Sequence, residues 1–269
     1  MSPLWRNHLR IGLCPDRLIL AGYRRGLRRR ISRREVVAIA PTPDPVRWQA
    51  AVDALRSALA PSSPGKPEVT VVLSNHFVRY ALLPWNETLK TEEEWMAYAR
   101  HRLTEAHGHL AEEWIVQVTE TAPRGPRIAA AVDKALLDAL EAKISESGSA
   151  LVSVQPYLMV AFNRLQSVIG NEWYWLVIEE PGRLTLALIE RGIWRAIRSR
   201  RVDEHWRRTL PEILEREDAV LGLERPCTQI VACTHEAIDT NVHKDYIVRD
   251  LTLAAGVRAS DRNLAMALG

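Results

Sequence analysis

The sequence predicts an α/β protein made of two similar halves, and three observations support this fold class. The twelve residues PDRLILAGYRRG, which start at Pro15, return as PGRLTLALIERG from Pro181, with seven identities and no gap. Each copy lies between two apolar runs, which is the pattern of a strand, a turn and a second strand. The 269 residues are 47% hydrophobic and 26% charged, as in a globular chain of one large or two ordinary domains.

The first half covers residues 1–170 and begins with a predicted hairpin at the turn pair Pro15-Asp16. Asp44, which precedes a proline, is a helix-start signal, and the run T-E-E-E from Thr91 is a capping-box pattern. Apolar runs predict strands over 9–14, 18–23, 36–40, 69–73, 78–83, 114–121, 127–132 and 151–154, and apolar periodicity predicts helices over 44–60, from 91, over 133–147 and over 157–169.

The second half, residues 171–269, repeats the opening of the first. Strands are expected over 173–178, 184–190, 193–199 and 228–234, and helices over 203–216 and 264–268. The first three strands form a meander with turns at Pro181-Gly182 and Arg191-Gly192. Two halves with the same opening predict two similar subdomains that face each other across a cleft. A chance similarity between two hairpins is the alternative.

Longer stretches of the sequence resemble a known family. They are VTVVLSNHFVRYALLPW (69–85), TEEEWMAYARHRL, EEWIVQVTE, DKALLDALEAKISESGSALVSVQPYLMVAFNRL (133–165) and RNLAMALG. In type and order these segments resemble the PilM, GspL and MshI assembly proteins of type IV pilus and type II secretion systems. The resemblance implies the actin-like (ASKHA, ribonuclease-H-like) fold, with two duplicated subdomains around a cleft and an inserted α/β region in the first.

The resemblance also implies a function. Proteins of this family are scaffolds that dock to the cytoplasmic segment of a PilN- or GspM-like bitopic inner-membrane protein and contact the assembly ATPase. We therefore expect a non-catalytic scaffold of a pilus or secretion platform. An actin-fold ATPase or kinase that binds nucleotide is the main alternative.

The turns that would hold nucleotide argue for the scaffold. In active members these turns cradle phosphate with backbone N–H groups, so they need small residues and free amides. Here they read Cys14, Pro15 and Asp16 in the first copy and Glu179, Glu180, Pro181 and Gly182 in the second. Proline has no N–H to donate, and carboxylates repel phosphate. We expect degenerate loops, no nucleotide, no cofactor and no catalysis; a metal held by Asp16 and Glu180 is a weaker alternative.

A third loop departs from the family in the same way. The resemblance implies a Gly-Gly pair that contacts adenosine at the end of the strand in TQIVACTHEA. This sequence has Thr234, His235 and Glu236 at that place. His101, His107 and His109 lie near a predicted helix end, and a helix-end role is favoured over zinc because no cysteine lies near them.

The partner is expected to bind the first half. Trp85 follows the strand that carries the resemblance most clearly, and Trp95 and Tyr98 lie on the next helix. Trp and Tyr are frequent anchors of interfaces, so these three aromatics are the candidate partner-binding residues. The alternative is that Trp95 and Tyr98 only pack their helix onto the sheet.

A basic run is the candidate membrane-facing surface. Seven of the eleven residues from position 24 to 34 are arginines: Arg24, Arg25, Arg28, Arg29, Arg30, Arg33 and Arg34. They could face anionic lipid headgroups or nucleic-acid phosphates, or they could be the charged, solvated edge of a sheet. No aromatic interleaving accompanies the run, so nucleic acid is the weakest of these readings.

The composition also bears on location. The sequence has three cysteines, Cys14, Cys227 and Cys233, and no CxxC spacing. This pattern predicts reduced thiols, with Cys227 and Cys233 in the core. No secretory signal and no apolar run of about 18 residues is found. We expect a cytoplasmic protein held peripherally at the inner membrane.

Overall fold

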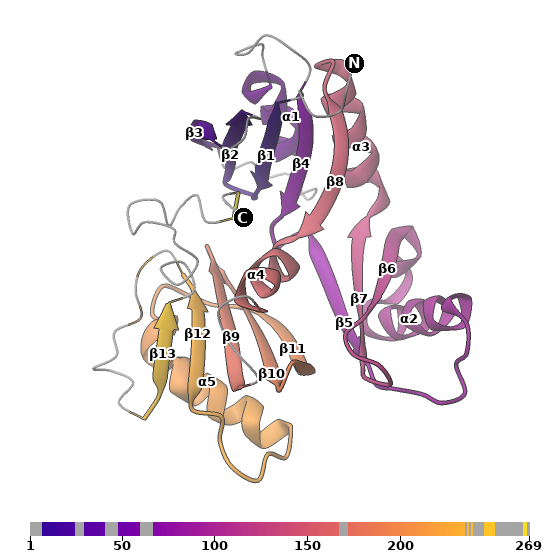
Figure 1. Ribbon diagram of the computed structural model, residues 1–269, viewed down its shortest axis with the longest axis vertical. Helices are drawn as coiled ribbons and strands as arrows, with labels where there is room; N and C mark the ends of the chain where they lie inside the picture. The colour runs from indigo at the N-terminus through magenta and orange to yellow at the C-terminus, as the bar shows by residue number, and fades with distance from the viewer. Residues whose placement is uncertain are drawn as a thin grey trace.

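The computed structural model describes residues 7–24, 30–40, 48–59, 67–166, 172–234, 236, 238, 245–250 and 266–267. These residues form two lobes, each with a five-stranded sheet, and a smaller α/β unit inserted in the first lobe (Figure 1). The predicted boundary between residues 170 and 171 falls outside the described residues.

The first lobe is built on a sheet of order β3-β2-β1-β4-β8. Its strands are β1 (His8–Leu13), β2 (Arg17–Arg24), β3 (Arg30–Ala38), β4 (Glu68–Leu73) and β8 (Ala150–Pro156). The strands β1, β2 and β3 pair antiparallel, whereas β1, β4 and β8 pair parallel. The helices α1 (Gln49–Ala58) and α3 (Lys134–Glu146) bury their apolar stripes against one face of this sheet (Figure 1).

The second lobe has the same topology. Its sheet has the order β11-β10-β9-β12-β13. The strands are β9 (Trp173–Glu180), β10 (Arg183–Glu190), β11 (Ile193–Arg201), β12 (Gln229–Cys233) and β13 (Ile247–Asp250). The first three again pair antiparallel, and β9, β12 and β13 pair parallel. The identical order and directions confirm that the repeated sequence marks a duplicated lobe.

The inserted unit lies between β4 and β8 in the chain. It contains β5 (Val78–Leu83), α2 (Glu92–His107), the 3-10 helix η2 (Gly108–Glu113), β6 (Trp114–Glu120) and β7 (Arg127–Asp133). Its strands form a sheet of order β5-β7-β6, and α2 packs on one face of it. The predicted capping box is confirmed, because the Thr91 side chain accepts from the Glu94 N–H and the Glu94 carboxylate accepts from the Thr91 N–H.

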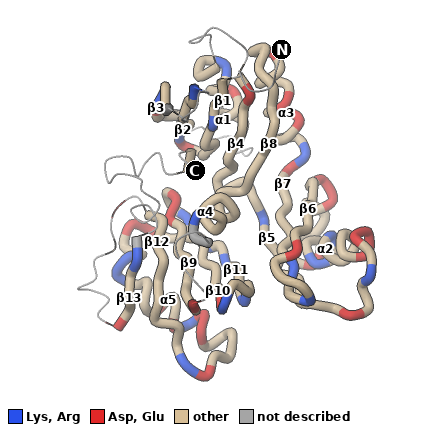
Figure 2. Tube along the Cα trace, viewed as in Figure 1, with Lys and Arg blue, Asp and Glu red and all other residues tan. Residues whose placement is uncertain are grey.

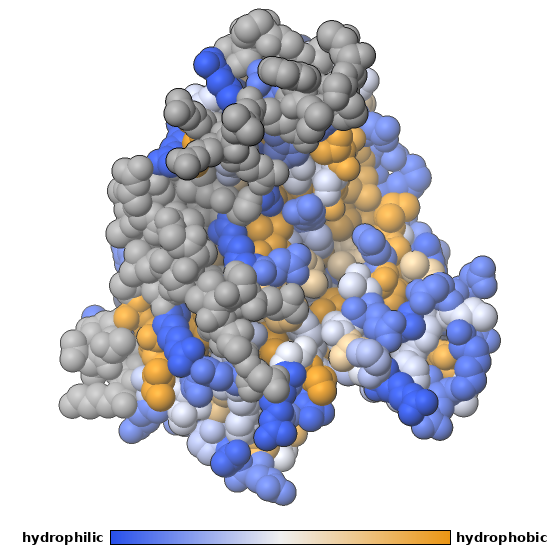
Figure 3. Space-filling model, viewed as in Figure 1, coloured by the Kyte–Doolittle hydropathy of each residue, from blue (hydrophilic) through white to orange (hydrophobic). Residues whose placement is uncertain are grey.

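The two lobes share an apolar cluster around α4 (Tyr157–Gln166). Side chains of β2, such as Ile19, and of β9, such as Leu176, pack into the same cluster. Near the end of the chain, Met266 and Ala267 also join it, and the Tyr23 hydroxyl donates to the Ala267 carbonyl at 3.2 Å. On the face of the molecule that Figure 3 shows, hydrophobic residues gather along the middle. The lobes are therefore joined by a core as well as by the chain.

Several predicted bounds shift. The strand expected over 36–40 begins earlier, as β3. The helix expected over 203–216 is α5 (Trp206–Val220). It begins later because Asp203 accepts from the His205 N–H in the preceding turn. It ends just before Gly222, which has φ 65°. The strand β13 was not predicted. The helix start at Asp44 and most of the helix over 264–268 lie outside the described residues; Met266 and Ala267 form a turn.

Charge is spread over the whole molecule. Basic and acidic residues are interspersed in both lobes and in the inserted unit (Figure 2), in keeping with the net charge of +3. None of the helices in the described part of the chain is long and apolar enough to span a membrane.

Candidate functional site

The two hairpin turns meet at one junction between the lobes. In the first turn, the Cys14 N–H donates to the Arg17 carbonyl at 3.0 Å, and the buried Cys14 thiol lies 3.6 Å from the Met266 sulfur. Burial raises the pKa of this thiol, and the carboxylate of Glu180 raises it further. The Ser74 N–H donates to the Leu13 carbonyl at 3.0 Å, and the Asn75 N–H donates to Glu180 Oε2 at 3.0 Å. The two turns therefore face the same region, as the repeat predicted.

The second turn is fastened to the first lobe by its own carboxylate. Glu180 is 4% exposed, and its Oε2 accepts from the backbone N–H of Asn75 at 3.0 Å. The Pro181 carbonyl lies 3.1 Å from Nε2 of His76, in the same β4–β5 turn. Burial raises the pKa of Glu180, and hydrogen bonds from Ser74 and Asn75 partly offset this effect.

Asn75 connects this contact to the other parts of the molecule. Its Oδ1 accepts from the Tyr80 hydroxyl at 2.7 Å and from the Leu158 N–H at 3.3 Å. Tyr80 lies on β5 of the inserted unit and Leu158 on α4. The role of Asn75 was not predicted from the sequence, where the polar residues Ser74, Asn75 and His76 between two apolar strands were the signal for it.

Two prolines and two carboxylates lie at the junction of the turns. Phosphate is held by N–H donors, but Pro15 and Pro181 have none. The Asn75 N–H, which a phosphate could have used, is taken by the Glu180 carboxylate. Glu179 is also engaged, since both of its oxygens lie 2.8 Å from Nη2 of Arg207. The contact of Glu180 with Asn75 binds one lobe to the other, whereas Glu179 and Arg207 both belong to the second lobe.

The structure describes part of the third loop, at residues 234–236, and the candidate metal ligand Asp16. Thr234 is buried, and its hydroxyl donates to the Glu236 carbonyl; His235 lies outside the described residues. Asp16 is exposed beside Arg17, at 3.7 Å. Across the described positions, no three His, Cys, Asp or Glu side chains gather in a way that could hold a metal ion. All three cysteines are buried and none forms a disulfide, which confirms the prediction of core thiols for Cys227 and Cys233.

The three predicted partner-binding aromatics form one cluster on the inserted unit. Trp95 is in its centre, with Trp85 at 5.9 Å and Tyr98 at 6.2 Å between ring centroids. Trp95 is only 1% exposed, and the Arg127 guanidinium covers its ring at 4.6 Å. Trp95 therefore packs α2 onto the sheet, which was the alternative to its expected role as an anchor. Trp85, 37% exposed, and the half-buried Tyr98 reach the surface.

The basic run is described in part. Arg25, Arg28 and Arg29 lie outside the described residues, and of Arg30 only the backbone, in β3, is described. Arg24 and Arg34 are exposed on β2 and β3.

Arg33 has local contacts instead. Its guanidinium donates to Glu35 Oε2 at 2.6 and 2.9 Å and to the Ala58 carbonyl at 2.8 Å. Arg33 therefore ties β3 to the end of α1.

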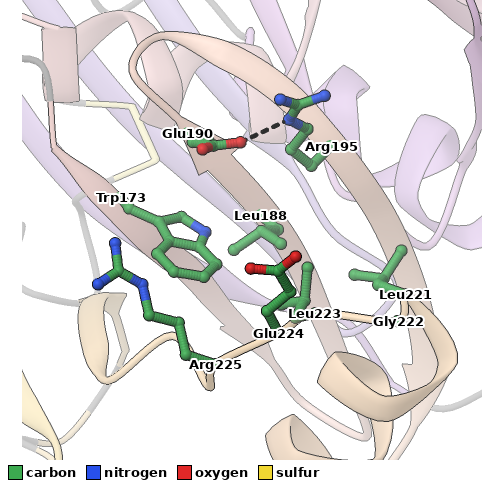
Figure 4. Close-up of a pocket in the computed structure, with 9 residues that line it drawn as sticks. All are labelled: Trp173, Leu188, Glu190, Arg195, Leu221, Gly222, Leu223, Glu224 and Arg225. Carbon is green, nitrogen blue, oxygen red and sulfur yellow. Dashed lines mark hydrogen bonds and ion pairs between the residues drawn. The ribbon is translucent and has the colours of Figure 1, made fainter.

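The second lobe also has a pocket that the sequence did not suggest. It measures about 450 Å³, with Trp173, Leu188, Leu221 and Leu223 among its apolar lining (Figure 4). The ion pair of Glu190 and Arg195, at 2.8 Å, lies on its rim. Trp173 and Glu190 pair at the ends of β9 and β10 that are remote from the turn at Pro181. This pocket is therefore separate from the junction of the turns.

Comparisons with solved structures support the fold. No family model and no curated protein sequence matches the chain. A Bacteroides thetaiotaomicron protein described as having an actin-like ATPase fold and unknown function is similar, at a TM-score of 0.62 and 13% identity, over 100% of this chain and 99% of that one.

Two assembly proteins are similar to the same degree. A chain of the PilM–PilN type IV pilus biogenesis complex gives a TM-score of 0.65 at 12% identity, over 99% of this chain and 97% of that one. The cytoplasmic domain of EpsL, an inner-membrane component of the type II secretion system of Vibrio cholerae, gives 0.58 at 12% identity, over 96% and 94%. The duplicated topology and these whole-length similarities show that the chain has the actin-like fold, as the resemblance implied.

Proposed function

We propose that this protein is a non-catalytic scaffold of a type IV pilus or type II secretion platform. In this role it works at the cytoplasmic face of the inner membrane and docks a short segment of a PilN-like bitopic protein. Support comes from the whole-length structural similarity to a chain of the PilM–PilN complex and to the EpsL cytoplasmic domain. Exposed Arg24 and Arg34 are suited to a contact with anionic lipid.

The observation that carries the non-catalytic part is the buried contact of Glu180 with Asn75. A carboxylate that accepts the Asn75 N–H stands where an active member needs donors for phosphate. Nucleotide binding would require this contact to break and a buried carboxylate to lie beside a triphosphate, and like charges at short range are costly. The contact therefore favours the scaffold over the ATPase or kinase alternative.

We place the partner on the inserted unit, at the surface formed by Trp85 and Tyr98. Trp85 rests on the fully buried Trp95, which gives the exposed ring a rigid support. A short segment that is disordered when free needs such a preformed surface with apolar anchors, because it must offset the entropy lost on ordering. Truncation of an anchor typically costs more than 1 kcal/mol of binding energy.

The test is co-purification with the full-length membrane partner. We expect Trp85→Ala and Tyr98→Ala each to weaken capture of a co-expressed PilN-like protein by about tenfold, in line with the loss of an interface anchor. Val220→Ala is the matched control, since Val220 is an exposed apolar residue on α5 of the other lobe. Circular dichroism checks folding. Capture at the level of the unchanged protein by both folded variants would show that this surface is wrong.

A further inference from the structure

The pocket of the second lobe combines an apolar lining with charged groups. The strands β9, β10 and β11 supply one side of it, and the loop that follows α5 supplies the other (Figure 4). Its lining side chains are apolar or charged: Trp173, Leu188, Leu221 and Leu223, and Glu190, Arg195, Glu224 and Arg225. Pockets that bind small molecules have this kind of lining and start at about 300 Å³, so a volume of about 450 Å³ is large enough for such a ligand.

The loop that forms one wall is held at both ends. At its start the Gly222 N–H donates to the Ala219 carbonyl and the Leu223 N–H donates to the Asp218 carbonyl, both at 3.1 Å. With Gly222 at φ 65°, these two bonds form the Schellman motif that ends α5. At the end of the loop, the Cys227 N–H donates to Oδ2 of the buried Asp218 at 3.1 Å. The wall is therefore formed before any ligand binds.

Both arginines of the lining are already engaged. The Arg195 Nε donates to Glu190 Oε2 at 2.8 Å. The Arg225 guanidinium lies over the Trp173 ring, 5.7 Å from its centroid, and Figure 4 shows the ring between this guanidinium and Leu188. Each positive charge therefore has a partner inside the lining, a carboxylate for one and an aromatic ring for the other.

Glu224 is the charged lining residue that lacks such a partner. Within the described part of the chain, its carboxylate makes no hydrogen bond and no ion pair. The side chain projects from the loop toward Trp173 and Leu188 (Figure 4). A carboxylate beside apolar side chains suits a ligand that buries an apolar body and pairs a positive charge.

We propose that this pocket binds a small organic cation, which has an apolar body and one ammonium group. The apolar body packs against Trp173, Leu188 and Leu223, and the ammonium group pairs with the Glu224 carboxylate. An anion of the same size would meet this carboxylate while both guanidinium groups are engaged, so it is disfavoured. The inference does not depend on the scaffold function, because it rests only on the pocket and its lining.

The test is an NMR titration of the full chain with three probes that share an apolar body: phenethylamine, which is protonated at neutral pH, phenethyl alcohol and hydrocinnamate. The indole N–H signal of Trp173, assigned by its loss in Trp173→Phe, reports occupancy. We expect a saturable shift with the amine and binding about threefold tighter than that of the alcohol, the scale of a solvent-exposed ion pair. The carboxylate probe should bind more weakly than the alcohol.

Glu224→Gln should remove the preference for the amine and leave the affinity for the alcohol unchanged. Glu212→Gln is the matched control, since Glu212 is exposed on α5 and lies outside this pocket. It should retain the preference. Linear, non-saturating shifts with the amine, tighter binding of the carboxylate probe, or a preference for the amine that persists in Glu224→Gln would overturn the proposal.

Discussion

The hairpin turns of the two lobes occupy equivalent places in the repeat but use their side chains differently. Cys14 and Glu180 are the residues just before the repeated proline, and both are buried at the junction between the lobes. The Cys14 thiol donates to the Met266 sulfur at 3.6 Å, a weak hydrogen bond between sulfur atoms near the end of the chain. Glu180 makes a polar contact with Asn75 in the other lobe.

The difference shows which part of a duplicated motif is free to change. The strands retain their leucines, because both sheets need the same buried positions. Cys14 and Glu180 project into the space between the lobes, where each meets a different neighbour. In this protein that space is used for contacts between the lobes.

The largest effects should be equal in the two lobes. Leu20 and Leu186 hold the same position in the repeat, and both are fully buried. Leu20→Ala and Leu186→Ala should each lower the free energy of unfolding by about 2–5 kcal/mol, through lost burial and the cavity left behind. Urea denaturation measures this. A cost below 1 kcal/mol in only one lobe would break the equivalence of the two sheets.

The second effect separates the turns. Without the Glu180 carboxylate the buried Asn75 N–H loses its acceptor, whereas glutamine keeps an oxygen there. Glu180→Ala should therefore be less stable than Glu180→Gln by about 1–3 kcal/mol. Cys14→Ala, at the matching position, should cost about 1 kcal/mol, since the thiol's bond to the Met266 sulfur is weak and its loss leaves no backbone N–H without an acceptor. Equal stability of the two Glu180 variants would remove the contact with Asn75 from the account.

The third effect is a dependence on pH. Burial raises the pKa of Glu180 in the folded protein above the ordinary value that it has in the unfolded chain. Between these two values the folded state binds more protons, so stability contributed by Glu180 falls as the pH rises, by at most about 1.4 kcal/mol per pH unit.

Glu180→Gln should abolish the part of the pH dependence of the unfolding free energy that Glu180 contributes. Urea denaturation of both proteins between about pH 4 and pH 8 measures it as the difference between their stabilities. We expect the difference to move in favour of the glutamine variant as the pH rises. A difference that is constant with pH would show that Glu180 titrates as it does in the unfolded chain.

The smallest effect concerns the backbone. Gly182 has φ 71°, in the left-handed region, whereas Asp16, its counterpart in the repeat, does not have a positive φ. Gly182→Ala should cost about 1 kcal/mol of strain, although no atom lies near the added methyl group. Asp16→Ala should change stability by less than about 0.5 kcal/mol. Thermal unfolding of the pair compares them, and equal shifts would mean that the two turns are conformationally alike.

Local signals in the sequence predicted most of the fold. The repeat from Pro15 and Pro181 identified two lobes because equivalent hairpins need equivalent buried leucines. The capping box at Thr91 fixed the start of α2, since both of its hydrogen bonds are made within four residues. The strand β13 was missed because it is short and its Ile247 is exposed, so it lacks an apolar pattern.

The candidate site was less predictable because its contacts are distant in the chain. Glu180 and Asn75 are separated by 105 positions, and no local pattern relates them. The sequence predicted Trp85 and Trp95 equally as partner-binding residues, although Trp85 lies at the surface and Trp95 lies in the core. Burial of a tryptophan depends on what packs over it, and the ring of Trp95 on α2 is covered by Arg127 from β7.

The most direct test of the central claim is isothermal titration of the protein with ATP in the presence of Mg²⁺. Glu180 occupies the junction as a contact between the lobes, and Pro15 and Pro181 supply no donors, so the titration should give no saturable heat. Circular dichroism of the same sample checks that the protein is folded. Saturable binding with micromolar affinity would contradict the account, because it would mean that the turns still form a phosphate site.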